Sequence, residues 1–436
     1  MKGETRNSNS EANSTYEIRN KPHGAVSKIA ASDFESGSGL ELRVSNLPRA
    51  SAPVRAIGIL GAGLMGQSIA LANARRAVAV GLTDVSPEAL RRAEAHLRRE
   101  VLPGWAPIQL TMSLSEVASS ADVLLECIIE KAAAKQKWLA EAEKFAPAHA
   151  VLASNTSSIP ISQLAKALAK PERFCGLHFC HPVRTRALVE VVRGTATSDE
   201  TMQTSIQYVR AIGKEPIAVQ DGPGFLLNRL LVLYLNEALA LLQAGPSIPD
   251  IESAATAFGM PLGPFAQLDA FGIDLALRVG ASLRKAFPDR IIVSELLVSL
   301  YQAGRLGVKS RAGFFRYDAE DGQPTVDRQV EEMICQHRRA QDRLTPEQIV
   351  VRLLLPMLIE ATRMVEEKRI ACLSDVDQAL VHGIAFPHGG LLKWANALGG
   401  RRLLEAIEQH QALGPRFQPS ALLYRLARAE HGFYQP

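Results

Sequence analysis

The sequence predicts a doubly wound α/β domain followed by two homologous all-α domains. Between residues 54 and 220, short apolar runs alternate with helical segments, a rhythm typical of a parallel sheet covered by helices. From residue 221 onward, long helical patterns replace this alternation. The helical part resembles itself, which indicates a duplication with a first domain at 221–343 and a second at 344–436.

Residues 1–53 differ from these three domains in composition. They are rich in Ser, Asn, Gly and Glu and show no sustained apolar period. Such a segment cannot bury enough apolar surface to offset the entropy that it would lose on ordering. We therefore expect a disordered N-terminal tail.

The α/β domain is expected to contain seven strands, because seven short apolar runs are followed by turn or helical signals. They lie at 56–60, 78–83, 123–129, 150–154, 174–179, 188–192 and 217–219. Between residues 93 and 116 we expect one clear helix, then the Pro- and Gly-rich stretch 103–107 and a short link.

A glycine-rich turn follows the first strand, with the sequence Gly61-Ala62-Gly63-Leu64-Met65-Gly66. Gly61 would allow the tight turn, Gly63 would let backbone N–H groups approach a pyrophosphate, and Gly66 would let the helix pack close to the strand. The diphosphate would then lie at a helix N-terminus, where unpaired N–H groups favour anions. A glycine-rich turn without a ligand is the alternative interpretation.

Asp84 at the end of the second strand indicates which dinucleotide binds. A carboxylate there suits the free 2′- and 3′-hydroxyls of an adenosine ribose and would repel a 2′-phosphate. Glycine turn, helix, strand and Asp84 together predict a Rossmann-type domain that binds NAD rather than NADP.

The duplication depends on three ordered matches. Arg229 recurs as Arg352, an offset of 352 − 229 = 123, and Asp250 recurs as Asp375, an offset of 375 − 250 = 125. A looser match joins residues 259–264 to 386–390. Chance similarity of amphipathic helices is the alternative, but the near-constant offset argues against it.

Composition excludes several classes of protein. The net charge is +4 and no basic run with interleaved aromatic residues occurs, so nucleic acid is not an expected partner. Five scattered cysteines without a CxxC pair indicate reduced thiols in a cytoplasmic protein and no metal site. The most apolar segment, 225–244, contains charged residues, so no membrane contact is expected.

His178 and Glu190 are the best candidates for proton transfer. Each lies in a strand-like run, and a turn centred near Arg184 would place them opposite each other across an antiparallel pair. A carboxylate beside an imidazole fixes its tautomer and stabilises the imidazolium. A structural salt bridge is the alternative, and His181 in the following loop is the rival base.

Four small polar residues, Asn155-Thr156-Ser157-Ser158, follow the strand at 150–154. Open α/β sheets bind ligands at the carboxyl ends of their strands. These residues could therefore donate hydrogen bonds to a substrate carbonyl or to the nicotinamide ribose. They could also form only a turn and a helix N-cap.

The chain resembles the L-3-hydroxyacyl-CoA dehydrogenase family over residues 54–320. Six ordered motifs carry this resemblance, and they begin at Gly61, Ser154, Gly176, Leu188, Asp221 and Gly304. The second helical repeat resembles the dehydrogenase part of the multifunctional fatty-acid oxidation α-subunit. We expect no room for that subunit's hydratase domain upstream.

The resemblance implies an NAD-dependent oxidation of L-3-hydroxyacyl-CoA to 3-ketoacyl-CoA in fatty-acid β-oxidation. It implies four catalytic residues: His178 as base, Glu190 as its partner, and Ser157 and Asn228 on the substrate oxygen. The cofactor-binding residues would be Gly61, Gly63, Leu64, Met65, Gly66, Asp84, Glu130, Lys135 and Asn155. Taken alone, Glu130 and Lys135 would look like an ordinary solvated helix start.

The sequence departs from the family in the segment after Asp84. The family usually has a longer helical hairpin there, which helps to hold CoA. Its shortening leaves two alternatives to the thioester dehydrogenase. One is a dehydrogenase of a small free hydroxy acid, and the other is a non-catalytic NAD-binding partner of a separate hydratase or thiolase.

The duplication also bears on assembly. Single-repeat relatives form homodimers through the helical domain, and a tandem copy could cover the same apolar face within one chain. We therefore expect a monomer. In the second repeat Val351 occupies the place equivalent to Asn228, and an apolar residue cannot make that hydrogen bond, so this repeat is expected to be structural.

Overall fold

The computed structural model describes residues 53–292, 294–317, 324–429 and 432–433. The predicted tail at 1–53 lies outside the described residues except for Pro53. The sheet and both helical repeats belong to one compact unit.

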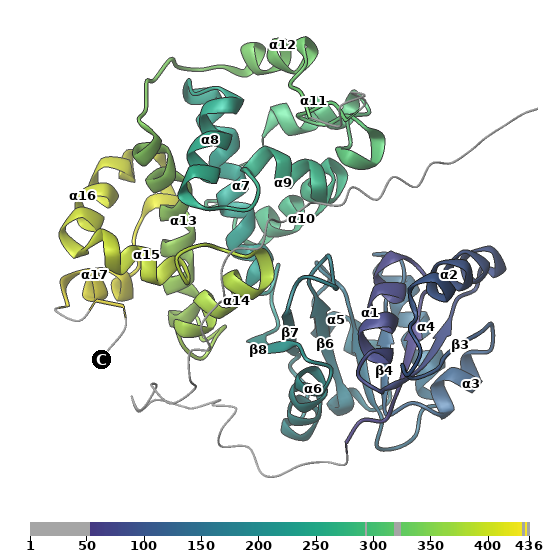
Figure 1. Cartoon of the computed structure of the whole chain (residues 1–436). Coiled ribbons are helices and arrows are strands. Elements are labelled where there is room, and N and C mark those ends of the chain that lie inside the picture. The colour runs from purple at the N-terminus through teal and green to yellow at the C-terminus, as the bar shows by residue number, and fades with distance from the viewer. Residues whose placement is uncertain (1–52, 293, 318–323, 430–431, 434–436) are drawn as a thin grey trace, which may run out of the picture. The chain divides into compact units, whose positions relative to one another are not determined.

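An eight-stranded sheet forms the centre of the first domain, with the strand order β3-β2-β1-β4-β5-β6-β7-β8 (Figure 1). β1 to β6 are parallel, β7 is antiparallel to β6, and β8 is parallel to β7. The strands are β1 (Ala56–Leu60), β2 (Ala79–Thr83), β3 (Ile108–Thr111), β4 (Val123–Glu126), β5 (Val151–Ser154), β6 (Phe174–Phe179), β7 (Leu188–Arg193) and β8 (Glu215–Gln220). The predicted fold class is confirmed.

The expected short link before residue 116 was wrong, because it contains strand β3 and helix α3 (Leu114–Ser119). β3 has four residues and pairs only with β2 at the edge of the sheet. Its side chains are partly or fully exposed, so it lacks the apolar run that marks the central strands. The single helix α2 (Pro87–Glu100) between β2 and β3 agrees with the shortened hairpin.

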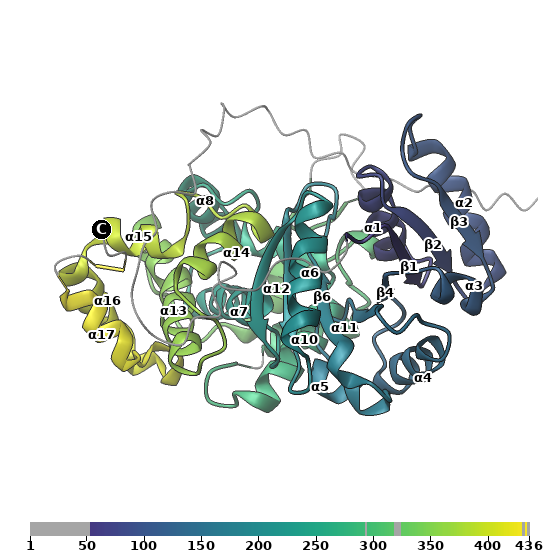
Figure 2. The same cartoon turned by 90° about the horizontal axis from the view of Figure 1, so that it is seen from below.

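Helices cover both faces of the sheet, and the side chains of each strand alternate between them. α1 (Leu64–Ala74), α2 and α6 (Asp199–Ala211) pack on one face, where Figure 2 shows α6 lying along β6. α3, α4 (Ala132–Glu143) and α5 (Ile161–Leu164) pack on the other. Cys180 and Leu188 belong to this second core, which continues into the helical repeats. The even-numbered residues of β6 and β7 therefore lie on the face of the sheet that this second core covers.

The two helical repeats have the same order of elements. The first contains α7 (Leu227–Ala244), α8 (Ile248–Phe258), α9 (Pro264–Phe271) and α10 (Ile273–Ala286). The second contains α13 (Pro346–Glu366), α14 (Ser374–Ile384), α15 (Leu391–Leu398) and α16 (Gly400–His410). The remaining elements are α11 (Glu295–Gln302), α12 (Arg328–His337), α17 (Ala421–Arg428), η2 (Ala165–Ala167), η3 (Pro171–Arg173), η4 (Val308–Ser310), η5 (Gln411–Leu413) and η6 (Pro415–Phe417).

A shared capping device supports the duplication. In the first repeat Glu252 on α8 accepts a hydrogen bond of 2.7 Å from the backbone N–H of Phe265 at the start of α9. In the second repeat Asp377 on α14 accepts one of 2.8 Å from Leu392 at the start of α15. Glu252 and Asp377 are separated by 377 − 252 = 125 residues, the offset seen in the sequence. Both carboxylates satisfy N–H groups that a helix start leaves unpaired.

The Glu252 cap should make the stability of the fold depend on pH. Burial raises the pKa of Glu252 to about 7, although hydrogen bonds from Phe265 and Ala266 oppose the shift. The folded chain then holds a proton that the unfolded chain releases above its ordinary pKa of 4.5, so stability falls as pH rises from there to about 7. We expect Glu252→Gln to reduce the difference in unfolding free energy between about pH 5 and pH 8 by about 2 kcal/mol, measured by urea unfolding. An unchanged pH dependence would contradict this assignment.

Within the described residues, every helix is too short or too polar to span a bilayer.

Candidate active site

The glycine-rich turn after β1 has the backbone geometry that its sequence indicated. Gly61 has φ +112°, which a residue with a side chain rarely adopts. A Cβ on Gly66 would lie 1.9 Å from the carbonyl oxygen of Gly61, so only glycine lets α1 start this close to β1. A Cβ on Gly63 would meet nothing within 4 Å. Gly63 therefore leaves open space beside the N-terminus of α1, where a pyrophosphate would bind.

Asp84 lies beside this turn at the end of β2. Its Oδ2 accepts a hydrogen bond of 2.9 Å from the backbone N–H of Ala62, and its Oδ1 accepts one of 2.9 Å from Ser86. The carboxylate is thus held next to the turn. Three large aliphatic side chains stay exposed near these strand ends, Leu64 (66%), Val85 (67%) and Ile129 (63%). Such surfaces suit the faces of an adenine ring, and no motif in the sequence marks Val85 or Ile129.

Gly66→Ala should abolish the dinucleotide site. Because the added methyl group would overlap the Gly61 carbonyl at 1.9 Å, the turn or the start of α1 must move. We expect NAD⁺ affinity to fall by at least about 100-fold, measured by isothermal titration calorimetry. Gly280→Ala is the matched control, because a Cβ there meets nothing within 4 Å. Equal affinities in the two variants would contradict the proposed geometry.

His178 on β6 and Glu190 on β7 occupy opposed positions of the antiparallel pair, as the sequence predicted. The Nδ1 atom of His178 lies 2.6 Å from the Oε2 atom of Glu190. His178 is 6% exposed and Glu190 is fully buried. The other carboxylate oxygen, Oε1, accepts backbone hydrogen bonds from Leu226 at 2.8 Å and Leu227 at 3.0 Å. The buried carboxylate is therefore fully partnered, whereas the Nε2 atom of the imidazole has no hydrogen-bond partner among the described residues.

Asn228 and Ser157 also lie together, although they are 71 residues apart. Asn228 is in the first turn of α7, and its Nδ2 donates to the carbonyl oxygen of Ser157 at 3.3 Å. Asn228 follows directly on Leu226 and Leu227, which hold Glu190. The start of α7 thus brings together residues from β7, from the loop after β5 and from the first helical repeat.

Glu130 organises the polar loop that contains Ser157. Its Oε1 accepts hydrogen bonds from the hydroxyls of Thr156 and Ser158 and from the backbone N–H groups of Ser157 and Ser158. Burial raises the pKa of Glu130, but the charge of Lys135 and the hydroxyls of Thr156 and Ser158 lower it by more, so that it lies below its ordinary value. The interpretation of residues 130 and 135 as a solvated helix start was wrong, because Lys135 is only 1% exposed.

Glu126 was missed in the sequence analysis. This fully buried carboxylate ends β4 and accepts hydrogen bonds from the Nζ of Lys135 at 2.7 Å and the hydroxyl of Ser154 at 2.6 Å. A single acid within the apolar run 123–129 was the available signal, the same one that revealed Glu190. Glu126 connects the cofactor candidate Lys135 with the strand that precedes the polar loop.

Asn155 makes a hydrogen bond to the strand that carries His178. Its side-chain oxygen accepts a hydrogen bond of 2.8 Å from the backbone N–H of Phe179, at the end of the strand that carries His178. Asn155 therefore ties the polar loop after β5 to the end of β6. His181 lies beyond β6 in the loop, where partial burial and the charge of Arg186 lower its pKa.

Family comparisons agree with this arrangement. The sequence model of the 3-hydroxyacyl-CoA dehydrogenase NAD binding domain matches residues 56–222. The model of the 3-hydroxyacyl-CoA dehydrogenase C-terminal domain matches twice, at residues 224–317 and 349–432. One domain model thus describes both helical repeats.

The chain is also similar to solved structures of 3-hydroxybutyryl-CoA dehydrogenases. A 3-hydroxybutyryl-CoA dehydrogenase from Escherichia coli is 25% identical with a TM-score of 0.74, over 86% of this chain and 98% of that one. A (S)-3-hydroxybutyryl-CoA dehydrogenase from Ralstonia eutropha is 32% identical with a TM-score of 0.56, over 61% of this chain and 100% of that one.

The dehydrogenase part of multifunctional enzyme 1 from C. elegans shares the fold, with 23% identity, a TM-score of 0.64, and coverage of 87% of this chain and 91% of that one. The two family models together match most of the described chain. The chain therefore belongs to the 3-hydroxyacyl-CoA dehydrogenase family and is an NAD-dependent oxidoreductase.

Proposed function

We propose that this protein oxidises L-3-hydroxyacyl-CoA to 3-ketoacyl-CoA reversibly, with His178 and Glu190 as a catalytic dyad. The observation that carries the proposal is the 2.6 Å contact between His178 Nδ1 and Glu190 Oε2 beside the dinucleotide-binding sheet. Bound NAD⁺ supplies the hydride acceptor. Residues of this chain remove the hydroxyl proton, stabilise the imidazolium and bind the substrate oxygen.

His178 removes the hydroxyl proton in this proposal. Because its Nδ1 faces Glu190, its Nε2 is the atom that accepts the proton. Glu190 stabilises the imidazolium that forms, and the N–H groups of Leu226 and Leu227 keep this carboxylate in place. Ser157 and Asn228 bind the substrate oxygen, for which their mutual contact positions them.

The thioester is the preferred substrate because the chain is similar to two 3-hydroxybutyryl-CoA dehydrogenases at 25% and 32% identity. A small free hydroxy acid remains the second candidate. The specific observation that favours it is the single helix α2, which replaces the longer hairpin expected to hold CoA.

A direct assay distinguishes these candidates. NADH absorbance would be followed with 3-hydroxybutyryl-CoA, with longer 3-hydroxyacyl-CoA thioesters and with free 3-hydroxybutyrate. Our proposal expects kcat/KM for the thioester to exceed that for the free acid by at least about 100-fold, because binding energy from remote groups contributes to transition-state stabilisation. A preference for the free acid would overturn the CoA assignment, and no turnover at all would favour the non-catalytic alternative.

The surroundings of the reaction follow from this proposal. β-Oxidation is the expected context, with a separate hydratase or thiolase supplying or consuming the thioesters. The five cysteines are all unpaired, which is consistent with a location in the cytoplasm.

The proposed protein is a monomer. Helices α7 and α13 pair within one chain, and buried ion pairs between the two repeats support this pairing. A tight dimer through the helical repeats in sedimentation experiments would contradict the monomer.

A further inference from the structure

Two buried ion networks join the helical repeats and are related by the duplication. In one, the Nε of Arg229 on α7 donates to Glu360 on α13 at 2.6 Å. In the other, the Nε of Arg352 on α13 donates to Glu237 on α7 at 2.6 Å. In each helix the arginine precedes the glutamate by eight residues (237 − 229 and 360 − 352). The two helices therefore exchange equivalent contacts.

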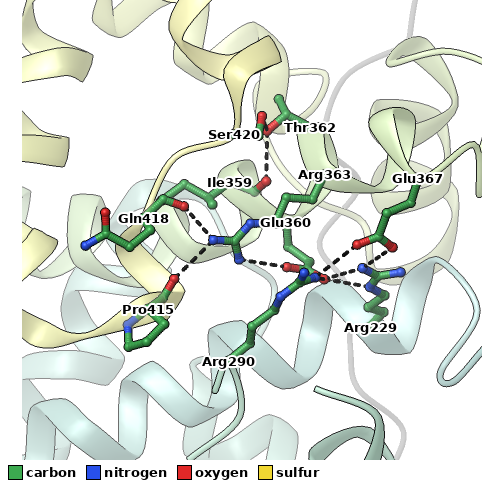
Figure 3. Close-up of polar contacts among 10 residues, drawn as sticks. All are labelled: Arg229, Arg290, Ile359, Glu360, Thr362, Arg363, Glu367, Pro415, Gln418 and Ser420. Atoms are coloured by element: carbon green, nitrogen blue, oxygen red, sulfur yellow. Dashed lines mark hydrogen bonds and ion pairs between the residues drawn. The ribbon is translucent and has the colours of Figure 1, made fainter. Parts of the chain in front are cut away.

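The network around Arg229 is larger than its counterpart (Figure 3). Arg229 also donates to Glu367 at 2.7 Å, and Arg290 donates to both Glu360 and Glu367 at 3.0 and 3.2 Å. The position equivalent to Glu367 in the first repeat is 367 − 123 = 244, which is an alanine. Only the network at the start of α7 has this second carboxylate.

The larger network lies at the helix start that supports the active site. Arg229 is next in sequence to Asn228, and the same turn contains Leu226 and Leu227, whose N–H groups hold Glu190. The counterpart Arg352 is next to Val351, which cannot act on a substrate. In the counterpart network a second arginine, Arg416, also binds Glu237, as Arg290 binds Glu360, so the two networks differ in the second carboxylate. That carboxylate, Glu367, occurs where α7 meets the candidate dyad.

A further contact of the second repeat reaches the same junction. Arg369 follows α13 and donates from Nη1 to the carbonyl oxygen of Asp221 at 2.8 Å. The carboxylate of Asp221 accepts the backbone N–H groups of Ile161 and Ser162 at 2.9 and 2.8 Å, just after the polar loop. The segment after α13 therefore contacts Asp221 directly, and Asp221 in turn holds the start of α5.

We propose that the second helical repeat positions the active site by holding Arg229, and with it the first turn of α7. Glu360 and Glu367 neutralise and orient a guanidinium that is 2% exposed. This fixes the direction in which α7 leaves β8, and hence the N–H groups aimed at Glu190. The second repeat is then a positioning element for the reaction, a role that rests on the proposed dehydrogenase function.

The test compares Glu367→Gln and Arg229→Lys with the control Arg352→Lys, all in the full chain. Arg352 is also buried, at 7% exposed against 2% for Arg229, and makes the equivalent Nε contact, so it reports loss of repeat packing alone. We expect kcat with 3-hydroxybutyryl-CoA to fall about tenfold in Arg229→Lys and about threefold in Glu367→Gln, since small misplacements of catalytic groups slow the reaction strongly. KM for NAD⁺ should stay within about twofold, and Arg352→Lys should retain kcat.

Hydrogen exchange gives a readout that does not depend on turnover. The amide hydrogens of Leu226 and Leu227 should exchange about tenfold faster in Arg229→Lys and Glu367→Gln than in the wild type. Their exchange rates should be unchanged in Arg352→Lys. Glu367 is partly exposed, so its variant should fold even if Arg229→Lys does not. Equal losses of kcat in Arg229→Lys and Arg352→Lys would overturn the inference, as would unchanged exchange in Glu367→Gln. A wild-type protein without thioester turnover would overturn the proposed function, while the exchange result would still decide the inference.

Discussion

His178→Ala should lower kcat/KM for 3-hydroxybutyryl-CoA by about 10²- to 10⁴-fold, the usual contribution of a positioned general base. The imidazole is held by Glu190 at 2.6 Å, and no other group of the dyad can replace its Nε2. NAD⁺ affinity should be unchanged, because the turn at Gly61 and Gly63 follows β1, whereas His178 lies on β6, which β4 and β5 separate from β1 in the sheet. Steady-state NADH formation and calorimetric NAD⁺ binding measure the two quantities.

A second histidine–carboxylate pair provides the control. His149 Nε2 lies 3.1 Å from Asp122 Oδ1 on the surface, where the histidine side chain is 68% exposed. His149→Ala should leave kcat/KM unchanged. If His178→Ala kept wild-type activity, His178 would have a structural role only, and the non-catalytic alternative would gain support.

Glu237→Ala should cause the largest loss of stability among the changes considered. Glu237 is fully buried and accepts hydrogen bonds of 2.6 Å from the Nε atoms of both Arg352 and Arg416. Its removal leaves two buried guanidinium groups without their carboxylate. Breaking a buried pair on one side typically costs about 3–5 kcal/mol. Urea unfolding monitored by circular dichroism would measure the decrease.

The control for this change is an exposed pair. Glu94→Ala removes a partner of Arg98, whose side chain is 78% exposed, and should produce no measurable shift of the unfolding midpoint. Similar shifts in the two variants would mean that the buried network contributes nothing specific. A double variant with Arg352→Met should recover part of the loss, because it removes one of the unpaired charges.

The sequence predicted the central strands well because they are buried on both faces and form unbroken apolar runs. It failed at β3, an edge strand of four residues, of which three are partly and one is fully exposed. Without the family resemblance it would also have failed at Lys135, whose environment on α4 depends on Glu126 at the end of β4. A charge at a helix start looks solvated when only neighbours in sequence are considered. The burial of Lys135 is decided by contacts with Glu126, Ile128 and Glu130, which the chain brings around it only on folding.

Some features of the candidate site could likewise be predicted from the sequence, and others could not. The register of His178 opposite Glu190 followed from the spacing and a hairpin turn, both of which are local properties of the chain. The sequence alone also determined the dinucleotide turn, since glycine positions encode backbone conformation directly. These features need no knowledge of distant residues.

Only the tertiary structure decided how the site is completed. The backbone of α7 reaches Glu190, Asn228 reaches Ser157, and Arg229 reaches Glu360, over separations of 36 to 131 residues. Backbone N–H donors carry no side-chain signature, and a salt bridge between two helices has no fixed spacing in the sequence. Periodicity and motifs report neighbours along the chain, whereas the support of the dyad comes from helices that meet only after folding.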